Sequence, residues 1–203
     1  MLNNVALIVA AGNGMRFGDA LPKQYHLLNK NRSILEETTS VFKNHPMIDL
    51  VCIVIAKTHP YNLDYLYTYG GDSRQESVRN GLRFLKKYNP KNILIHDGVR
   101  PFVSSNLISA VLSKLETYQA VDIALPIVDT VKTYNGSVIP RETLYASQTP
   151  QGFHFDIIFD LYEKVVGSYT DDISLYLEGG GNNLGIVPGD QKNIKITFKD
   201  DLY

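Results

Sequence analysis

The chain has 203 residues, of which 44% are hydrophobic and 20% are charged, so it is long enough to bury a substantial core. The net charge of −1 argues against the nonspecific nucleic-acid binding that a basic surface supports. No apolar run has the length of a membrane span, and no basic leader precedes the first apolar run. We therefore expect a cytoplasmic protein with no nucleic-acid or membrane partner, whose single cysteine, Cys52, lies in the core.

Strand and helix signals alternate along the chain. Apolar runs predict strands at Val5–Ala10, Leu50–Ile55, Ile93–His96, Val121–Leu125 and Leu184–Val187, with helical patterns between them. This alternation is typical of the α/β class, in which helices cover a mainly parallel sheet. Ligands of such proteins bind at the carboxyl ends of the strands, so we expect the functional site there.

Serine residues mark the starts of two helices. Ser73 and Glu76 have the spacing of a capping box ahead of an apolar helix face. Ser104 or Ser105 is expected to cap a second helix, which carries a wide apolar stripe. A third helix is predicted near Phe155–Val166.

The segment from Thr130 to Leu144 interrupts the alternation. Asn135-Gly136 stands there between two alternating runs, which is the strongest short-range signal for a β-hairpin. We expect this hairpin to project as an arm, at about residues 130–146, with Arg141 on its return strand. The arm would belong to a single domain that spans residues 1–203.

The turn after the first strand carries both glycines and cations. Gly12 and Gly14 allow the backbone to approach a ligand closely, and Arg16 and Lys23 follow on the same loop. Neither the P-loop pattern nor the dinucleotide fingerprint fits these glycines. Two cations beside a glycine turn suit the binding of a phosphate chain, so the segment predicts a nucleoside triphosphate site, with a simple strand-to-helix turn as the alternative.

Three later segments are expected at the same edge of the sheet. Asp97 follows a predicted strand and is placed to hold Mg²⁺ against phosphate oxygens, although a turn aspartate is the alternative. Asp171 and Asp172 can bind metal or cap the helix that follows, and we favour capping for at least one of them. In NIKIT, the alternation places Lys195 opposite the two isoleucines, where an exposed lysine is usual.

Six short motifs together resemble the 2-C-methyl-D-erythritol 4-phosphate cytidylyltransferase family and extend over essentially the whole chain. They are AAGNGMRFG with PKQ, GGDSRQESVRNGL, HDGVRP, QTPQ, TDDIS and NIKIT. The resemblance implies a Rossmann-like α/β domain whose β-arm hooks onto a second subunit and so forms a homodimer. The runs RQESVRNGL and QTPQGF also resemble bifunctional forms, in which this enzyme is the N-terminal half and a cyclodiphosphate synthase follows.

The resemblance also implies roles for individual residues. Arg16 and Lys23 would be catalytic, by stabilising the transition state on the α-phosphate of CTP, and Asp97 would hold Mg²⁺. The positions that match nucleotide-binding residues are Ala10, Ala11, Gly12, Gly14, Gly71, Asp72, Ser77, Asp97 and Lys195. The positions that match substrate-binding residues are Arg141, Thr149 and Thr170, with Arg141 reaching in from the partner's arm. The chain departs from the commonest pattern at Gly98-Val99, where two alanines are usual, so ribose contacts near this point are not carried over.

The reaction implied is the transfer of CMP from CTP to 2-C-methyl-D-erythritol 4-phosphate, with Mg²⁺ as cofactor. Its products would be 4-diphosphocytidyl-2-C-methyl-D-erythritol and pyrophosphate, in non-mevalonate isoprenoid biosynthesis. A phosphate monoester, with a second pKa of about 6, is largely a dianion near pH 7, so no base is needed and His96 is expected to pack against the sheet. The alternatives are a ribitol 5-phosphate cytidylyltransferase, a sugar-1-phosphate nucleotidylyltransferase and a noncatalytic nucleotide-binding subunit.

Overall fold

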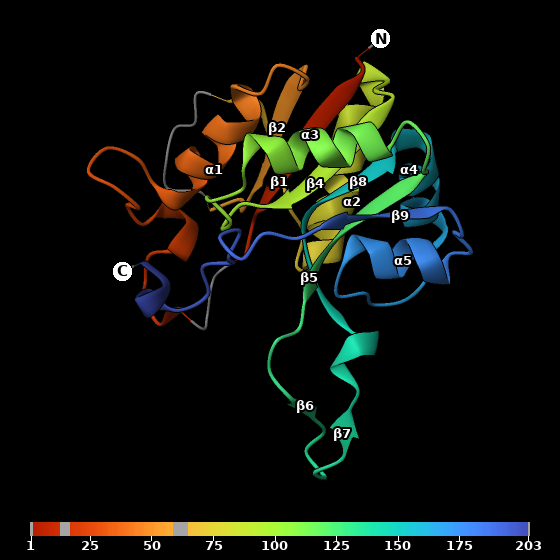
Figure 1. Cartoon of the computed structure of the whole chain (residues 1–203). Coiled ribbons are helices and arrows are strands. Elements are labelled where there is room, and N and C mark those ends of the chain that lie inside the picture. The colour runs from red at the N-terminus through yellow and green to blue at the C-terminus, as the bar shows by residue number, and fades with distance from the viewer. Residues whose placement is uncertain (1, 13–16, 59–64, 203) are drawn as a thin grey trace.

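The computed structural model describes residues 2–12, 17–58 and 65–202. Within these residues, a seven-stranded sheet forms the centre of the molecule, with the strand order β3-β2-β1-β4-β8-β5-β9 (Figure 1). Its strands are β1 (Asn4–Ala10), β2 (Leu50–Ile55), β3 (Tyr67–Tyr69), β4 (Asn92–Asp97), β5 (Ala120–Pro126), β8 (Tyr145–His154) and β9 (Leu184–Pro188). The strands predicted from the sequence are all present, and the α/β class is confirmed.

Strand β8 runs antiparallel to its neighbours β4 and β5, whereas the other paired strands of the sheet are parallel. The sequence does not predict β8, because Pro150 and Gly152 interrupt a polar run that lacks the alternation of a strand. An irregularity in the pairing with β5, between Val121 and Ile123, accommodates this run. The short strand β3, which runs parallel to β2, also escapes prediction, and β8 is the strand that makes the sheet mainly rather than wholly parallel.

Helices cover both faces of the sheet. They are α1 (Ile34–Lys43), α2 (Arg74–Leu85), α3 (Ser105–Lys114), α4 (Phe155–Lys164) and α5 (Asp172–Glu178). The helix predicted near Phe155–Val166 is α4, which ends at Lys164. Among the helices of the described residues, none is both long and apolar enough to cross a membrane.

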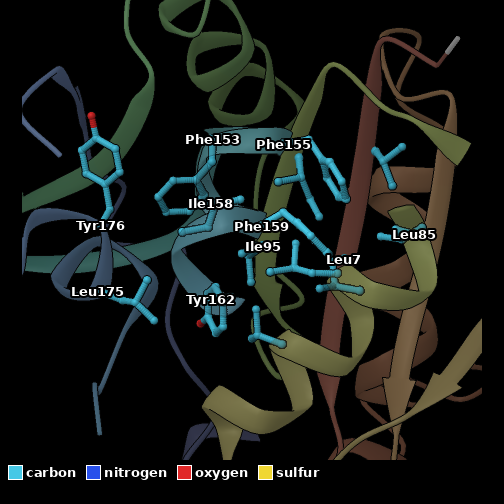
Figure 2. Packing of buried hydrophobic residues seen from close by; sticks show 14 of the residues in the cluster. Leu7, Leu85, Ile95, Phe153, Phe155, Ile158, Phe159, Tyr162, Leu175 and Tyr176 are labelled. Atoms are coloured by element: carbon cyan, nitrogen blue, oxygen red, sulfur yellow. The ribbon is translucent and has the colours of Figure 1, made fainter. Parts of the chain in front are cut away.

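The alternation of side chains along β1 divides the core into two layers. Val5 and Leu7 pack under α2 and α4, whereas Ala6 and Ile8 pack under α1 and α3. This follows because successive side chains of a strand point to opposite faces of the sheet. Figure 2 shows the first layer, in which side chains of α4 and α5 meet those of the sheet. Burial of β1 on both faces explains its continuous apolar sequence.

The helix starts follow the serine signals in the sequence. Ser104 caps α3 and Ser73 caps α2, each through a side-chain oxygen that accepts a backbone N–H of the first turn. The predicted capping box of α2 is only half formed, because the Glu76 carboxylate accepts the N–H of Asp72 instead of that of Ser73. A complete capping box starts α1, which the sequence analysis leaves without a cap.

The order of the strands creates a crevice at one edge of the sheet. β1 lies between β2 and β4, and parallel sheets with such a change of direction bind ligands beyond the carboxyl ends of these strands. The loops after β1 and β4 converge closely there, since a Cβ on Gly98 would lie 2.9 Å from the Cβ of Ala10. Glycine at position 98 therefore lets the two strand ends meet at one point.

The predicted hairpin is present and projects away from the sheet (Figure 1). Its strands are β6 (Val131–Lys132) and β7 (Val138–Ile139). The chain leaves the sheet after Pro126 and rejoins it at Tyr145, where these two residues pair. The sequence predicts Arg141 on the return strand, but this prediction is wrong. In the structure, Arg141 follows β7 in a short 3-10 helix.

The segment NIKIT crosses the end of the sheet and forms no strand, although all of its residues are described. The predicted alternation is wrong here, because Ile196 is buried while Ile194 is 40% exposed. The N–H of Ile196 donates to the carbonyl of Val99 in the loop after β4. This bond holds the segment, and with it Lys195, beside the crevice.

Candidate active site

A cavity of about 900 Å³ opens at the carboxyl ends of β1 and β4. Volumes of this order are common for ligand sites. Most of the residues that the sequence assigns to catalysis or nucleotide binding line this cavity, which we call the larger cavity: Ala10, Ala11, Gly12, Lys23, Gly71, Asp72, Ser77, Asp97 and Lys195. Gly14 and Arg16 lie outside the described residues. The departure from the family pattern at Val99 falls in this site as well, because Val99 is one of the residues that line the cavity.

A smaller cavity of about 370 Å³ adjoins the larger one. Thr149 and Thr170, which the sequence assigns to substrate binding, both line it. Of the described residues, Arg74, Asp97 and Lys195 line both cavities, and we call these three side chains the junction. Ligands in the two cavities would therefore come together at the junction.

Asp97 is the last residue of β4, and cationic side chains surround its carboxylate. Among the described residues, Lys195 Nζ lies 2.9 Å from Oδ2, Arg74 Nε lies 3.4 Å from Oδ1 and Arg100 Nε lies 3.5 Å from Oδ2. Burial alone would raise the pKa of Asp97, but the charges of Arg74, Lys195 and Arg100 outweigh burial and hold the pKa well below its usual range. These four side chains, the Asp97 cluster, therefore contain an ionised carboxylate at neutral pH.

Buried Gln24 holds the turn after β1 in place. Its Nε2 donates to the carbonyls of Ala10 and Gly12, at 2.8 and 2.9 Å. The neighbouring Lys23 donates from Nζ to the carbonyl of Ile196 at 2.7 Å. The Pro-Lys-Gln triplet thus connects the glycine turn to the NIKIT segment, which we call the C-terminal segment. This connecting role of Gln24 is not predicted from the sequence.

Thr149 lies in a chain of hydrogen bonds whose direction can be assigned. His96 Nε2 is 3.1 Å from the carbonyl oxygen of Arg100, which can only accept, so the ring carries its proton on Nε2. Nδ1 then accepts from the Thr149 hydroxyl at 3.0 Å, and the hydroxyl oxygen accepts the N–H of Asp97 at 3.1 Å. The Thr149 hydroxyl therefore offers a ligand a lone pair and not a hydrogen, which suits a ligand hydroxyl better than a phosphate oxygen.

The acidic pair after Thr170 has two separate roles. Asp171 caps α5 by accepting the N–H of Ser174, which confirms the prediction for one member. Asp172 is fully buried and accepts hydrogen bonds from Arg74 Nη1 and Nη2 at 3.1 and 2.8 Å. No group of three or more side chains suited to hold a metal occurs among the described residues, so any metal here would depend on ligand oxygens as well.

Arg74 is the junction residue that the sequence analysis does not identify. It starts α2 and stands inside the motif GGDSRQESVRNGL, but its partner Asp172 is 98 residues further along the chain. One local feature of the sequence could have drawn attention to Arg74, because a positive charge in the first turn of a helix opposes the helix dipole. An arginine at that position needs another source of stability, which here is the buried carboxylate.

Arg141 lies away from the junction in its own chain. It contacts the carbonyl of Val128 and, at 3.6 Å, the carboxylate of Glu142. It lines neither cavity, as far as the described residues define them. Substrate binding by Arg141 would therefore require the arm of a second subunit.

Two adjoining cavities that share cationic walls, at the end of an α/β sheet, are the arrangement expected of a nucleotidyltransferase. Comparison with known proteins gives the same class. A model of the 2-C-methyl-D-erythritol 4-phosphate cytidylyltransferase family, IspD, matches residues 4–203. The chain belongs to this family.

Individual relatives agree with this assignment. The chain is 37% identical over 218 residues to the bifunctional enzyme IspD/IspF of Paramagnetospirillum magneticum, a match that covers 100% of the chain and 56% of that relative. It is 37% identical over 215 residues to the 2-C-methyl-D-erythritol 4-phosphate cytidylyltransferase of Caldicellulosiruptor saccharolyticus, which covers 99% of the chain and 95% of the relative. The crystal structure of the Francisella tularensis enzyme matches with a TM-score of 0.83 and 30% identity, over 98% of this chain and 96% of that one. The chain thus spans about half the length of the bifunctional relatives, at 56%.

His96 is expected to stay neutral at working pH. Burial lowers the pKa of His96 to about 4, although the hydrogen bond to the Arg100 carbonyl and the charge of Asp97 act in the opposite direction. Because the pKa is lower in the folded than in the unfolded chain, stability from the neutral ring should be lost as the pH falls from about 6.5 towards 4. Ring-nitrogen NMR shifts during a pH titration, assigned with His96→Asn, would test this. A midpoint near 6.5, or a proton on Nδ1 at neutral pH, would contradict the hydrogen-bond chain.

Proposed function

We propose that this protein transfers CMP from CTP to 2-C-methyl-D-erythritol 4-phosphate, which gives 4-diphosphocytidyl-2-C-methyl-D-erythritol and pyrophosphate for isoprenoid biosynthesis. Membership of the family supports this reaction. The observation that carries it is the junction, because Arg74, Asp97 and Lys195 line both cavities. A triphosphate in the larger cavity and a phosphate monoester in the smaller one would meet there. The cytoplasmic location stays a prediction from the sequence.

The reaction is an in-line displacement at the α-phosphorus of CTP. An oxygen of the acceptor phosphate forms a bond to this phosphorus while the bond to the oxygen that bridges to the β-phosphate breaks, and pyrophosphate leaves with that electron pair. The acceptor monoester has a second pKa of about 6, so it attacks as a dianion and no proton has to be removed. His96, which is buried and neutral, is therefore not needed as a base.

The main barrier is electrostatic, because two anions must approach each other and charge grows on the α-phosphate. Lys23 and Lys195 lie in the wall of the larger cavity and supply positive charge there. Lys195 is bound to Asp97 at 2.9 Å, which places its ammonium group at the junction before any ligand arrives. Arg16 keeps the same proposed role from the sequence, outside the described residues.

The donor set at the junction suits Mg²⁺. This ion usually takes one or two protein carboxylates and completes its shell with water and phosphate oxygens. Asp97 offers one ionised carboxylate in the wall of the larger cavity, which fits that pattern. When bound, Mg²⁺ supplies positive charge that neutralises the triphosphate.

The smaller cavity offers both kinds of contact that a polyol phosphate needs. Arg100 brings positive charge for the phosphate group. Thr149 offers a lone pair, and the Asp171 carboxylate accepts hydrogen bonds, so both can receive ligand hydroxyl groups. A charged end and a hydroxylated chain would therefore be recognised by different sides of this cavity.

We also propose that two subunits complete each other's sites through the arm. The arm exposes apolar side chains, among them Val128 at 67% and Val138 at 60%. A two-stranded hairpin is at best marginally stable alone in water, so these side chains favour packing against another copy. A twofold dimer in which each arm crosses over would also carry Arg141 towards the partner's smaller cavity.

A turnover assay tests the proposed reaction. With CTP and Mg²⁺, the protein should release pyrophosphate only when 2-C-methyl-D-erythritol 4-phosphate is present, and mass spectrometry should identify the cytidylyl product. Ribitol 5-phosphate, offered in parallel, should be the poorer acceptor. Faster transfer to ribitol 5-phosphate would assign that acceptor instead, and CTP-dependent release with neither acceptor would contradict a cytidylyltransferase function.

Replacement of Asp97 by asparagine should weaken Mg²⁺-dependent turnover, because the amide lacks the charge that holds a hard cation. We expect kcat to fall about 100-fold and half-maximal activity to require more Mg²⁺. Asp156→Asn, which changes an exposed carboxylate in the first turn of α4, is the matched control and should leave both quantities unchanged. Unchanged Mg²⁺ activation in Asp97→Asn would mean that Asp97 only holds the cations around it.

Mixing two inactive variants tests the shared site. Arg141→Ala and Lys23→Ala should each be inactive, but a heterodimer of the two holds one site with both wild-type residues. After subunit exchange, confirmed by native mass spectrometry, about a quarter of wild-type activity should return, because half of the dimers are mixed. Confirmed exchange without recovered activity would show that Arg141 does not act across the interface.

A further inference from the structure

Arg74 lies at the junction but has no part in the reaction described so far. Its Nη1 and Nη2 donate to the two oxygens of Asp172, at 3.1 and 2.8 Å, and its Nε faces Asp97 at 3.4 Å. A guanidinium group has five N–H donors in a rigid fork, and these contacts use three of them. The other two are the donors that we assign to ligand oxygens below.

Asp172 fixes the guanidinium group from the protein interior. The carboxylate is fully buried and also accepts the hydroxyl of Tyr162 from α4. The N–H of Asp172 donates to Gln151 Oε1 at 3.0 Å, which ties the start of α5 to strand β8. A buried carboxylate is costly unless it is paired, so Asp172 holds Arg74 in one position. The Arg74 side chain nevertheless remains 26% exposed, and it lines both cavities.

A second arginine of α2, Arg83, also forms an ion pair but does not lie at the junction. Arg83 forms a two-point pair with Glu163, at 2.8 and 3.1 Å, on the protein surface. It lines neither cavity within the described part of the chain. Burial alone would lower the pKa of Arg74, but the charges of Asp172 and Asp97 raise it, so Arg74 is a permanent cation. The two arginines therefore provide a test residue and a matched control on one helix.

We propose that Arg74 is a catalytic residue that contacts both reacting phosphates, and that Asp172 and Tyr162 are positioning residues that fix its guanidinium group at the junction. This inference rests on the proposed function. The guanidinium group donates to the α-phosphate of CTP from the larger cavity and to the acceptor phosphate from the smaller one. It thereby aligns the two groups and reduces their repulsion, which the single ammonium of a lysine could not do with the same geometry.

Paired substitutions separate this role from a structural one. Arg74→Gln alone leaves Asp172 buried without its charged partner, so this variant is expected to lose stability. The double variant with Asp172→Asn removes both charges and should recover most of the loss in unfolding midpoint. Its kcat should nevertheless stay about 100-fold or more below that of the wild type. A folded double variant with kcat within about threefold of the wild type would overturn the proposal.

Arg74→Lys gives a second test that does not depend on the double variant. It keeps a positive charge beside Asp172, yet kcat should fall about tenfold or more while KM for CTP changes less. Tyr162→Phe removes only the hydroxyl that Asp172 accepts, so it should lower kcat by less than Arg74→Lys does. Arg83→Lys should match the wild type. Wild-type kcat in Arg74→Lys would overturn the proposal even if the double variant did not fold.

Wild-type activity separates this inference from the proposed function. If the wild type transfers CMP to neither acceptor, the proposed function fails, and Arg74 is then tested by the binding of tripolyphosphate in calorimetry. Arg74→Lys should bind tripolyphosphate about tenfold more weakly than the wild type and Arg83→Lys do. Equal affinity of all three proteins would overturn the assignment of Arg74.

Discussion

The ionised carboxylate of Asp97 is the group on which the rest of the site depends. It draws together Arg74 from the start of α2, Arg100 from the loop after β4 and Lys195 from the C-terminal segment. A buried carboxylate without these partners would be costly, and these cations without the carboxylate would repel one another. Each part of the chain that supplies a cation is therefore fixed against the end of β4.

The fold turns this cluster into a meeting point for two ligands. The crevice between the ends of β1 and β4 forms the larger cavity, while antiparallel β8 brings Thr149 to the backbone of Asp97 and forms a wall of the smaller one. The C-terminal segment then joins the two, because Lys195 binds Asp97 while the carbonyl of Ile196 accepts Lys23. Since these charges are arranged before ligands bind, little reorganisation is needed in the transition state.

The sequence predicts those parts of the structure that depend on local patterns. The apolar run of β1 indicates a buried strand. Asp97 can be placed at a strand end because it directly follows the apolar run of another predicted strand, and that strand is β4. A cap at Ser104 or Ser105 and one within the pair Asp171-Asp172 are predicted for a similar reason, since a cap acts on the residues that directly follow it, and the structure assigns them to Ser104 and Asp171.

Features that depend on partners far away in the sequence cannot be predicted from local patterns. Strand β8 is polar and contains Pro150, and it forms because β4 and β5 pair with it on both sides. The alternation in NIKIT misplaces Ile194, which is exposed, since the segment is held by Val99 instead of by a neighbouring strand. Arg74 has a role only because Asp172, 98 residues away in sequence, is buried beside it.

The meeting of the two phosphates at the Asp97 cluster can be observed directly in a crystal structure with a non-reactive CTP analogue, Mg²⁺ and 2-C-methyl-D-erythritol 4-phosphate. We expect the α-phosphate of the analogue in the larger cavity and the acceptor phosphate in the smaller one, with Arg74 and Lys195 in contact with both. An α-phosphate bound away from the junction, or an acceptor phosphate outside the smaller cavity, would contradict this arrangement.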